Sequence, residues 1–334
     1  MKVSIRDLSK MTGFSSATIS NALNHKKGVN RETAEEIFRV ARETGYLSAN
    51  AVTKIRLVVF KKNGQILEET PFFQQMIEGI EEECHRLGYE MVISHVDQRN
   101  PNYQKQVRDL LEEQGVGIVL LGTEMMDGDL NPYRNASCPV LLLDHWTELM
   151  DFNSVLINNA DAARAITEHL LDNGHREVGY LRGNYRIKAF RSRFIGFQTA
   201  LKKYKVPYKE EYTVTVGTYM STACQDMLEY LKKKPKLPTA FFADNDIIAL
   251  GAMKALQEMG YRIPEDVSIV GFDDLTFSEI SSPPLTTLRV EKREMGKMAV
   301  RRLVELIDGI GTSTVTKIQV CPKIIYRNTV KNIK

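Results

Sequence analysis

Cysteine is scarce in this chain of 334 residues, and the few that occur are far apart: Cys84, Cys138, Cys224 and Cys321. They form no Cys-x-x-Cys pair, so the sequence argues against a structural zinc site and against thioredoxin-type redox chemistry. We expect scattered buried thiols in a reducing compartment.

Long apolar runs are missing as well, because no stretch approaches the roughly 20 apolar residues of a membrane span. Charged residues interrupt the N-terminal segment, which therefore lacks the apolar core of a signal peptide: Lys2, Arg6, Asp7 and Lys10. We expect a cytoplasmic protein with no membrane partner.

The motifs of common α/β enzymes are also absent. The sequence has no G-x-G-x-x-G after a strand, no G-x-x-x-x-G-K-[ST], no G-x-S-x-G and no H-E-x-x-H. We therefore expect a protein that is not an enzyme and that needs no cofactor and no metal. The alternative is a sugar-handling α/β enzyme such as a kinase or dehydrogenase, which turnover of ATP or binding of NAD would favour.

The net charge of +3 is distributed unevenly. Residues 1–54 contain nine Lys and Arg against five Asp and Glu, whereas the remaining 280 residues contain 36 basic and 37 acidic groups. A small basic head on a near-neutral body indicates a polyanionic partner such as DNA. A solvated basic surface is the alternative that charge alone leaves open.

Three short helices are predicted in the first 45 residues. Ser4 begins the first in a capping-box pattern with Asp7, Ser15 begins the second and Asn30 begins the third. Gly13 separates the first two helices by a tight turn. This order is typical of a helix-turn-helix unit, whose second helix enters the major groove of DNA.

The second predicted helix has a short, polar and uncharged face. On a helical wheel, one arc of about 140° holds five residues: Ser16, Ala17, Ser20, Asn21 and Asn24. Such small side chains approach base edges and phosphates closely. Lys26 and Lys27 follow the helix and are expected near the phosphate backbone. An ordinary three-helix bundle with a polar face is the alternative.

Residues 3–24, VSIRDLSKMTGFSSATISNALN, and 29–46, VNRETAEEIFRVARETGY, resemble the DNA-binding head of the LacI/GalR family of bacterial transcriptional regulators. The resemblance implies base contacts by Ser16, Ala17 and Asn21, and phosphate contacts by Thr18, Ser20 and Asn24. Most relatives have Arg where this chain has Asn21. Arg suits guanine and Asn suits adenine, so we expect a shifted operator preference.

From residue 55 on, apolar strand-like runs alternate with helical stretches. The runs are 55–60, 89–96, 117–122, 139–144, 155–159, 177–181, 212–216, 239–244 and 267–274; the helical stretches are 74–87, 102–114, 160–173, 190–204, 221–233 and 247–259. Repeated β-α order predicts parallel sheets covered by helices on both faces. We expect two α/β lobes with four to six strands each.

Ligands of such sheets bind at the carboxyl ends of the strands. Those ends offer Lys61, Phe72, Phe73, His95, Asp97, Thr123, residues 144–146, Arg182, residues 244–246 and residues 273–274. Carboxylates, an Arg and aromatic rings suit a small polyhydroxylated ligand. Several have structural alternatives: Phe72 and Phe73 as core anchors, Trp146 as packing and Asp273 as a turn cap. We expect Asp246 to cap the next helix and His175 to pack a turn.

The body resembles the effector domain of the same family, which is similar to periplasmic sugar-binding proteins. The resemblance rests on NNADAARAITEHLLDNGHREVGYLRG, RFIGF and residues 243–309 from ADNDIIALG to VELIDG. It implies that Arg193 and Asp273 grip the effector, that Phe72 and Phe73 stack on it, and that Asn245 lies at the end of the sixth strand. With Trp146, these six residues are the candidate effector site between two lobes.

The predicted organisation is an all-α helix-turn-helix head at 1–47, a shortened linker at 48–54 and an effector-binding and dimerisation domain at 55–334. The domain divides into an N-lobe (55–157 and 288–314) and a C-lobe (158–285 and 316–334), with crossings near 156–159, 284–288 and 314–317. We expect a sequence-specific repressor that binds operator DNA as a homodimer under control of a small molecule, a sugar. A nucleoid-type architectural DNA binder would not explain the large ligand-domain pattern.

The linker is unusual, because only eight residues separate Tyr46 from Ile55. Relatives usually have a longer segment with an "ARSL"-like hinge helix, whose Leu wedges into the minor groove. Val52 is the one candidate wedge here, and it is short and β-branched. Holding a kink open needs a bulky apolar side chain, so we expect weaker operator bending than in hinge-helix relatives.

Overall fold

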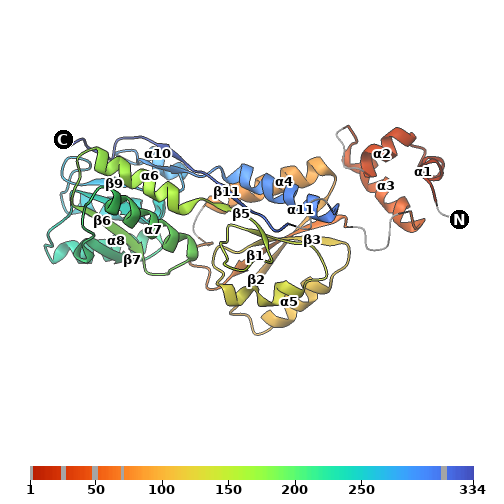
Figure 1. Ribbon diagram of the computed structural model, residues 1–334, viewed down its shortest axis with the longest axis horizontal. Helices are drawn as coiled ribbons and strands as arrows, with labels where there is room; N and C mark the ends of the chain where they lie inside the picture. The colour runs from red at the N-terminus through yellow and green to blue at the C-terminus, as the bar shows by residue number, and fades with distance from the viewer. Residues whose placement is uncertain (1–2, 24–27, 47–51, 69–70, 310–313) are drawn as a thin grey trace. The chain divides into compact units, whose positions relative to one another are not determined.

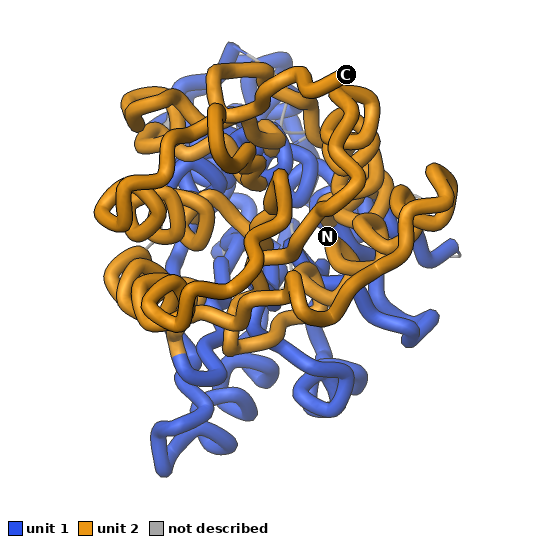
Figure 2. Tube along the Cα trace, turned by 90° about the vertical axis from the view of Figure 1, so that its left-hand side faces the viewer, with its two compact units in different colours: residues 1–63, 74–155, 292–318 blue, residues 64–73, 156–291, 319–334 orange. Residues whose placement is uncertain are grey.

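The computed structural model describes residues 3–23, 28–46, 52–68, 71–309 and 314–334. It divides into two compact units, each built from three chain segments (Figure 2). Unit 1 consists of residues 1–63, 74–155 and 292–318, and unit 2 of residues 64–73, 156–291 and 319–334. The chain therefore passes between the units after residues 63, 73, 155, 291 and 318.

Three helices form the head at the start of unit 1: α1 (Ile5–Thr12), α2 (Ser16–Leu23) and α3 (Arg31–Glu43) (Figure 1). Leu8, Ile19 and Ile37 come one from each helix and are fully buried in their common core. Ser4 and Asp7 form the predicted capping box, and Gly13 ends α1 in the left-handed conformation, with φ 75°. The predicted order of three helices is confirmed.

Unit 1 also contains a six-stranded sheet in the order β11-β5-β4-β3-β1-β2. Its strands are β1 (Lys54–Lys61), β2 (Glu90–Asp97), β3 (Val116–Leu121), β4 (Val140–Leu143), β5 (Asn153–Ile157) and β11 (Lys317–Val320). Strands β1 to β5 pair in parallel, so their carboxyl ends share one edge. The inner strand β3 is buried along its whole length, as a strand covered on both faces should be.

Helices cover both faces of this sheet. Helices α4 (Phe72–Leu87) and α11 (Lys292–Ile307) lie on one side of it and α5 (Tyr103–Glu112) on the other (Figure 1). The 3-10 helix η1 (Asp127–Asn135) contributes Leu130 and Tyr133 to the core beneath α5.

Unit 2 is built around a four-stranded parallel sheet in the order β7-β6-β8-β9. Its strands are β6 (Val178–Gly183), β7 (Thr213–Val216), β8 (Ala240–Ala243) and β9 (Ser268–Val270). Its helices are α6 (Asn159–Asp172), α7 (Lys188–Lys203), α8 (Met220–Lys232), α9 (Asp246–Glu258), the short α10 (Thr276–Ile280) and the 3-10 helix η2 (Glu210–Tyr212). The pairs α6–α7 and α8–α9 pack extensively, and α8 and α9 share a core with the sheet.

A small two-stranded sheet completes unit 2. Strand β10 (Thr287–Arg289) pairs antiparallel with β12 (Lys323–Ile325). The segment after β9 continues beside β10, because Gly271 N donates to Thr286 O over 3.0 Å and Asp273 N to Leu288 O over 2.8 Å. The loop that follows "IVGF" is thus held against β10.

The fold class predicted from the β-α alternation is confirmed: an all-α head is followed by parallel sheets in a type I periplasmic-binding-protein-like domain. Each predicted helix agrees with an observed one to within two residues. The run at 267–274 was too long, since β9 ends at Val270 and the rest forms the loop along β10. The alternation did not reveal α11 or the short strands β10, β11 and β12.

The predicted linker at 48–54 overlaps the sheet. Lys54 is the first residue of β1, and Thr53 N already donates to Gly115 O over 3.0 Å. On the other side, Glu90 N donates to Thr53 O over 3.2 Å. Residues 47–51 lie outside the described part. Within the described part, Val52 is the one linker residue before Thr53 joins the sheet through hydrogen bonds.

Candidate DNA-binding surface and effector site

The outward face of α2 is polar and uncharged. Ser16 and Ala17 are exposed and Ser20 and Asn21 are half-buried, whereas Ile19 is fully buried. Short side chains of this kind allow the helix backbone to approach base edges closely. Of the predicted DNA-binding residues, Ser16, Ala17, Ser20 and Asn21 thus share one helix and one face.

The start of α2 is fixed by its own side chains. Ser15 Oγ accepts from Thr18 N over 3.0 Å and lies 2.8 Å from Thr18 Oγ1, as an N-cap should. Thr18 is half-buried at this helix start. The remaining candidates, Asn24, Lys26 and Lys27, lie outside the described residues.

In unit 2, the guanidinium of Arg193 on α7 gathers groups from three strand ends. Its Nε donates to Asn159 Oδ1 over 2.8 Å, its Nη1 to Asp244 O over 2.6 Å and its Nη2 to Asp273 Oδ1 over 3.3 Å. Its Cζ lies 3.6 Å from the centroid of the Phe272 ring, a cation–π distance. The structure therefore brings together the predicted pair Arg193 and Asp273.

A second charged pair lies next to the first. Asp244 is fully buried at the end of β8, where its carboxylate accepts from Tyr180 Oη, Arg186 Nη1 and, over 2.8 Å, Gly183 N. Burial raises the pKa of Asp244, and the guanidinium of Arg186 opposes this rise. Asp244 was among the predicted strand-end groups, but its cation was not.

The prediction that Asp246 caps α9 is wrong. Asn245 is the N-cap, since its Oδ1 accepts from Ile248 N over 3.0 Å. Asp246 is fully buried and accepts from Ser278 Oγ over 2.6 Å, Leu275 N over 3.0 Å and the hydroxyl of Thr287. Burial and the nearby carboxylate of Asp273 raise the pKa of Asp246 to about 7.

The aromatic candidates lie in different surroundings. Phe72 and Phe73 form an edge-to-face pair with ring centroids 5.0 Å apart, and both are buried. Trp146, just after β4 in unit 1, is 41% exposed. The ammonium of Lys317 lies 4.8 Å from the centroid of its ring. An effector role for these rings stays a prediction.

Sequence reasoning missed several groups around Arg193. Arg186 and Arg193 both place their Cζ atoms near the ring of Phe190, at 5.5 and 5.6 Å from its centroid. Phe272 and Asn159 contact Arg193 directly. A usable signal existed for Arg186, because the sequence NYRIKAF follows the strand ending at Gly183 and so lies at a carboxyl end.

Other predicted strand-end residues are engaged elsewhere. Asp97 pairs with Arg99 over 2.7 Å, and hydrogen bonds from Arg99 lower the pKa of Asp97 to about 2. His175 is buried, with Nδ1 2.8 Å from Thr239 Oγ1 and Nε2 3.1 Å from Lys331 O. Burial lowers the pKa of His175, which agrees with its predicted role in packing a turn.

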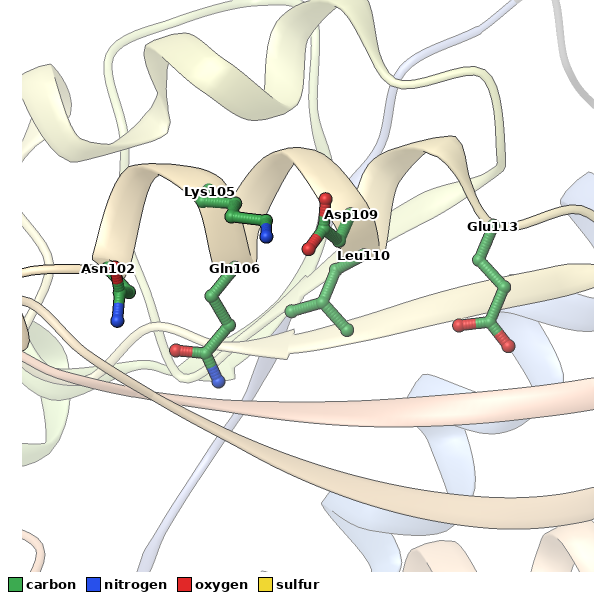
Figure 3. Close-up of a pocket in the computed structure, with 6 residues that line it drawn as sticks. All are labelled: Asn102, Lys105, Gln106, Asp109, Leu110 and Glu113. Carbon is green, nitrogen blue, oxygen red and sulfur yellow. The ribbon is translucent and has the colours of Figure 1, made fainter.

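A hollow of about 390 Å³ runs along α5 in unit 1 (Figure 3). It is lined by Asn102, Lys105, Gln106, Asp109, Leu110 and Glu113, which all belong to one segment of chain. In Figure 3, the side chains of Gln106 and Leu110 point from the helix toward the strands beside it. No predicted site residue lines this hollow, and we assign it no role.

Within the described ranges, His, Cys, Asp and Glu side chains form no group of three or more that could hold a metal ion. None of the helices that the structure describes combines the length and apolar character needed to cross a membrane.

Comparisons with known proteins agree with the fold. Residues 167–330 match the family model of the periplasmic binding protein-like domain. The HTH-type transcriptional repressor PurR of Mannheimia succiniciproducens is 30% identical over 333 residues, which cover 98% of this chain and 99% of the repressor.

Solved structures of similar proteins also belong to transcriptional regulators of the LacI type. A protein described as a LacI-type transcriptional regulator from Bacillus cereus subsp. cytotoxis has a TM-score of 0.75 and 28% identity, covering 85% of this chain and all of its own. The lac repressor dimer bound to operator and the anti-inducer ONPF has a TM-score of 0.73 and 25% identity, over 99% of this chain and all of its own.

Proposed function

Because the chain belongs to the LacI/GalR family of transcriptional regulators, we propose that it is a homodimeric repressor whose affinity for a pseudo-palindromic operator changes when a neutral carbohydrate binds to the effector domain. The chain is a ligand-controlled DNA-binding regulator rather than an enzyme, as its repressor relatives are. A regulator of bacterial transcription works where the chromosome lies, so we place it in the cytoplasm.

The face of α2 supports the operator contact. Ser16, Ala17 and Asn21 offer small side chains on a helix that α1 and α3 hold by its buried side. Each chain supplies one such helix, which reads one half-site, so a two-fold symmetric operator needs two chains. Asn24, Lys26 and Lys27 complete the proposed surface at the phosphates.

An exposed apolar pair on α10 supports the second copy. Phe277 is 46% exposed and Ile280 is 73% exposed. They are three residues apart and therefore share one side of the helix. We place part of the dimer contact on this side, because burial in a second copy would remove two large apolar side chains from water.

The pair of Arg193 and Asp273 is the observation that carries the effector proposal. The guanidinium of Arg193 on α7 and the carboxylate of Asp273 after β9 offer donors and acceptors for sugar hydroxyls. Arg193 pairs with Asp273 and Arg186 pairs with Asp244. Because each cation faces a carboxylate, the site suits a neutral ligand better than a phosphorylated one.

Phe72, Phe73, Trp146 and Asn245 are the further proposed contacts. Aromatic rings cover the CH faces of sugars, and the ring of Trp146 has a large exposed fraction for this purpose. A ligand that binds one conformation of the effector domain better than another shifts the population of both. Operator affinity then changes by the same coupling factor, in either direction.

The first test combines operator selection with a sugar screen. Sequences selected from random double-stranded DNA should contain two symmetric half-sites. Trp146 is the single Trp of the chain, so its fluorescence reports a ligand that reaches it. Neutral mono- and disaccharides are then compared with glucose 6-phosphate and with purine bases. A response to a neutral sugar that also changes operator affinity supports the proposal, and a response confined to phosphates or bases contradicts it.

The second test addresses the dimer. Sedimentation at micromolar concentration should give about twice the chain mass of 38.0 kDa. Ile280→Asp should shift this equilibrium toward the monomer and weaken operator binding, because it places a charge on the proposed contact. Ile195→Asp is the matched control, since Ile195 is also an exposed apolar residue of unit 2, on α7. A dimer unaffected by Ile280→Asp would place the contact elsewhere.

A further inference from the structure

The loop after β9 has an unusual backbone. Asp273 and Asp274 follow each other with φ values of 116° and 50°, both in the range that favours glycine. Non-glycine residues in this range are strained and persist only where their surroundings fix them. The proposed effector ligand Asp273 is thus half of a strained pair.

Asp274 fixes this loop through two arginines from distant segments. Its Oδ2 accepts from Arg289 Nε over 2.6 Å, and its Oδ1 lies 2.7 Å from Arg327 Nη2. The carboxylate of Asp274 and the guanidinium of Arg327 are largely buried, with exposed side-chain fractions of 7% and 11%. Water screens such a pair less than an exposed one.

Asp246 holds the same loop on its other side. It accepts from Leu275 N, Ser278 Oγ and Thr287 Oγ1, so it joins the loop to α10 and to β10. Asp273 N donates to Leu288 O of β10 over 2.8 Å. Asp273 therefore faces Arg193 from a loop whose next two residues, Asp274 and Leu275, are both bound to other segments.

The two arginines belong to chain segments that run between the units: Arg289 lies two residues before one crossing, and Arg327 lies nine residues after another. Arg289 is the last residue of β10, and the chain enters unit 1 after residue 291. Arg327 follows β12, in the segment that joins unit 2 after residue 318. Asp274 thus ties the loop of the proposed effector site to both of these segments.

We infer that Asp274 is a positioning residue that transmits effector binding: it holds Asp273 toward Arg193 and passes any displacement of Asp273 to Arg289 and Arg327. This inference rests on the proposed function, because it requires an effector at Asp273. A ligand that displaces Asp273 from Arg193 also displaces the loop backbone. Because Asp274 is held by Arg289 and Arg327, the displacement also acts on these two arginines. The coupling then reaches β10 and the 323–327 segment.

The first experiment needs no effector. Hydrogen exchange is measured on the full chain for wild type, Asp274→Asn, Arg289→Gln and Asp266→Asn. Asp266→Asn is the matched control, because Asp266 forms an exposed ion pair with Arg262 in the same unit. We expect faster exchange at the amides of Asp273 and Leu275 in Asp274→Asn and Arg289→Gln, and no change there in the control. Unchanged exchange in Asp274→Asn overturns the inference.

The second experiment measures coupling. Operator affinity is determined with and without maltose, sucrose, trehalose, melibiose and cellobiose at millimolar concentration. For a sugar that acts on wild type, Asp274→Asn should reduce the ratio of the two affinities about tenfold, the usual size of an allosteric coupling. A purely structural role lowers the melting temperature and leaves this ratio unchanged, which overturns the inference.

The two experiments separate the two claims. If none of these sugars acts on wild type, the carbohydrate proposal is weakened and the exchange experiment still decides the position of Asp273. If a sugar acts equally on wild type and on Asp274→Asn, the proposed function stands and the inference about Asp274 fails.

Discussion

Gly196 of α7 lies so close to Ala160 of α6 that a β-carbon on Gly196 would be 2.1 Å from the carbonyl oxygen of Ala160. Real β-carbons do not come this close to backbone oxygen. The pair α6–α7 therefore depends on a missing side chain at its crossing, and α7 also carries Arg193. The five residues RFIGF therefore contain both a packing residue, Gly196, and a proposed effector contact, Arg193.

Gly196→Ala should destabilise the chain by about 1–3 kcal/mol, because the helices must separate to admit the methyl group. The free energy of unfolding in urea measures this loss. Gly128→Ala is the control, since no atom lies within 4 Å of the β-carbon it would add. Equal stability of the two variants would mean that α6 and α7 can move apart without cost.

Arg193→Ala should reduce affinity for the effector sugar at least tenfold, since a hydrogen bond to a charged group contributes about 1.5–3 kcal/mol. Operator affinity without sugar should stay unchanged. Because the arginine is buried, Asp273→Asn, which preserves the side-chain shape, provides a second variant. Arg191→Ala changes an exposed residue of the same helix and should bind sugar normally. Full sugar affinity in both Arg193→Ala and Asp273→Asn would refute the site.

Asn21→Arg should change the preferred base at one position of each half-site toward guanine, because Arg donates two hydrogen bonds to guanine O6 and N7. Such a contact discriminates between bases by about 1–3 kcal/mol. Selection from random DNA gives the motif of each protein. Glu32→Gln on the exposed side of α3 should retain the wild-type motif. The same motif for Asn21→Arg would show that residue 21 does not read bases.

Asp246→Asn should make stability depend less on pH. The pKa of Asp246 is about 7 in the folded chain and 3.8 in the reference state, so between these values the folded state binds the extra proton. The free energy of unfolding therefore falls as pH rises from about 4 to 7, by at most about 1.4 kcal/mol per pH unit from this group. Removing the carboxyl removes that slope.

Urea denaturation at several pH values checks this expectation. Asp266→Asn is the control, because hydrogen bonds from Arg262 lower the pKa of Asp266 to about 2, so Asp266 titrates below this window. A slope that is equal in wild type and Asp246→Asn between pH 4 and 7 would mean that Asp246 is ionised throughout.

The sequence predicted the alternation of strands and helices well because each element of the parallel sheets has its own local apolar pattern. The pairs β10–β12 and Asp274–Arg327 were beyond such reasoning, since their partners are far apart in the chain and no local pattern links them. Helix α11 had a usable signal: Met295, Ala299, Val300 and Leu303 recur at helical spacing and are all buried.

The sequence predicted the principal pair of the candidate site, whose effector role stays a prediction, but not the residues around that pair. Arg193 and Asp273 followed from family resemblance, and the structure places them 3.3 Å apart. The capping of α9 was assigned to the wrong one of two adjacent polar residues, because Asn245 and Asp246 are both good N-caps and the choice depends on Ser278 and Thr287. Arg186 was missed because its position depends on an ion pair with Asp244, which lies 58 positions away in the chain.

The discontinuous composition of the two units affects how the protein is made. The head is one continuous segment and has all its helices once residue 43 has left the ribosome. The sheet of unit 1 lacks α11 until residue 307 has been synthesised and β11 until residue 320, and unit 2 lacks residues 321–334 even then. On a nascent chain, the DNA-reading helices can therefore form long before either ligand-domain unit is complete. A head that contacted DNA at this stage would not be controlled by the effector, because the effector domain would still be incomplete.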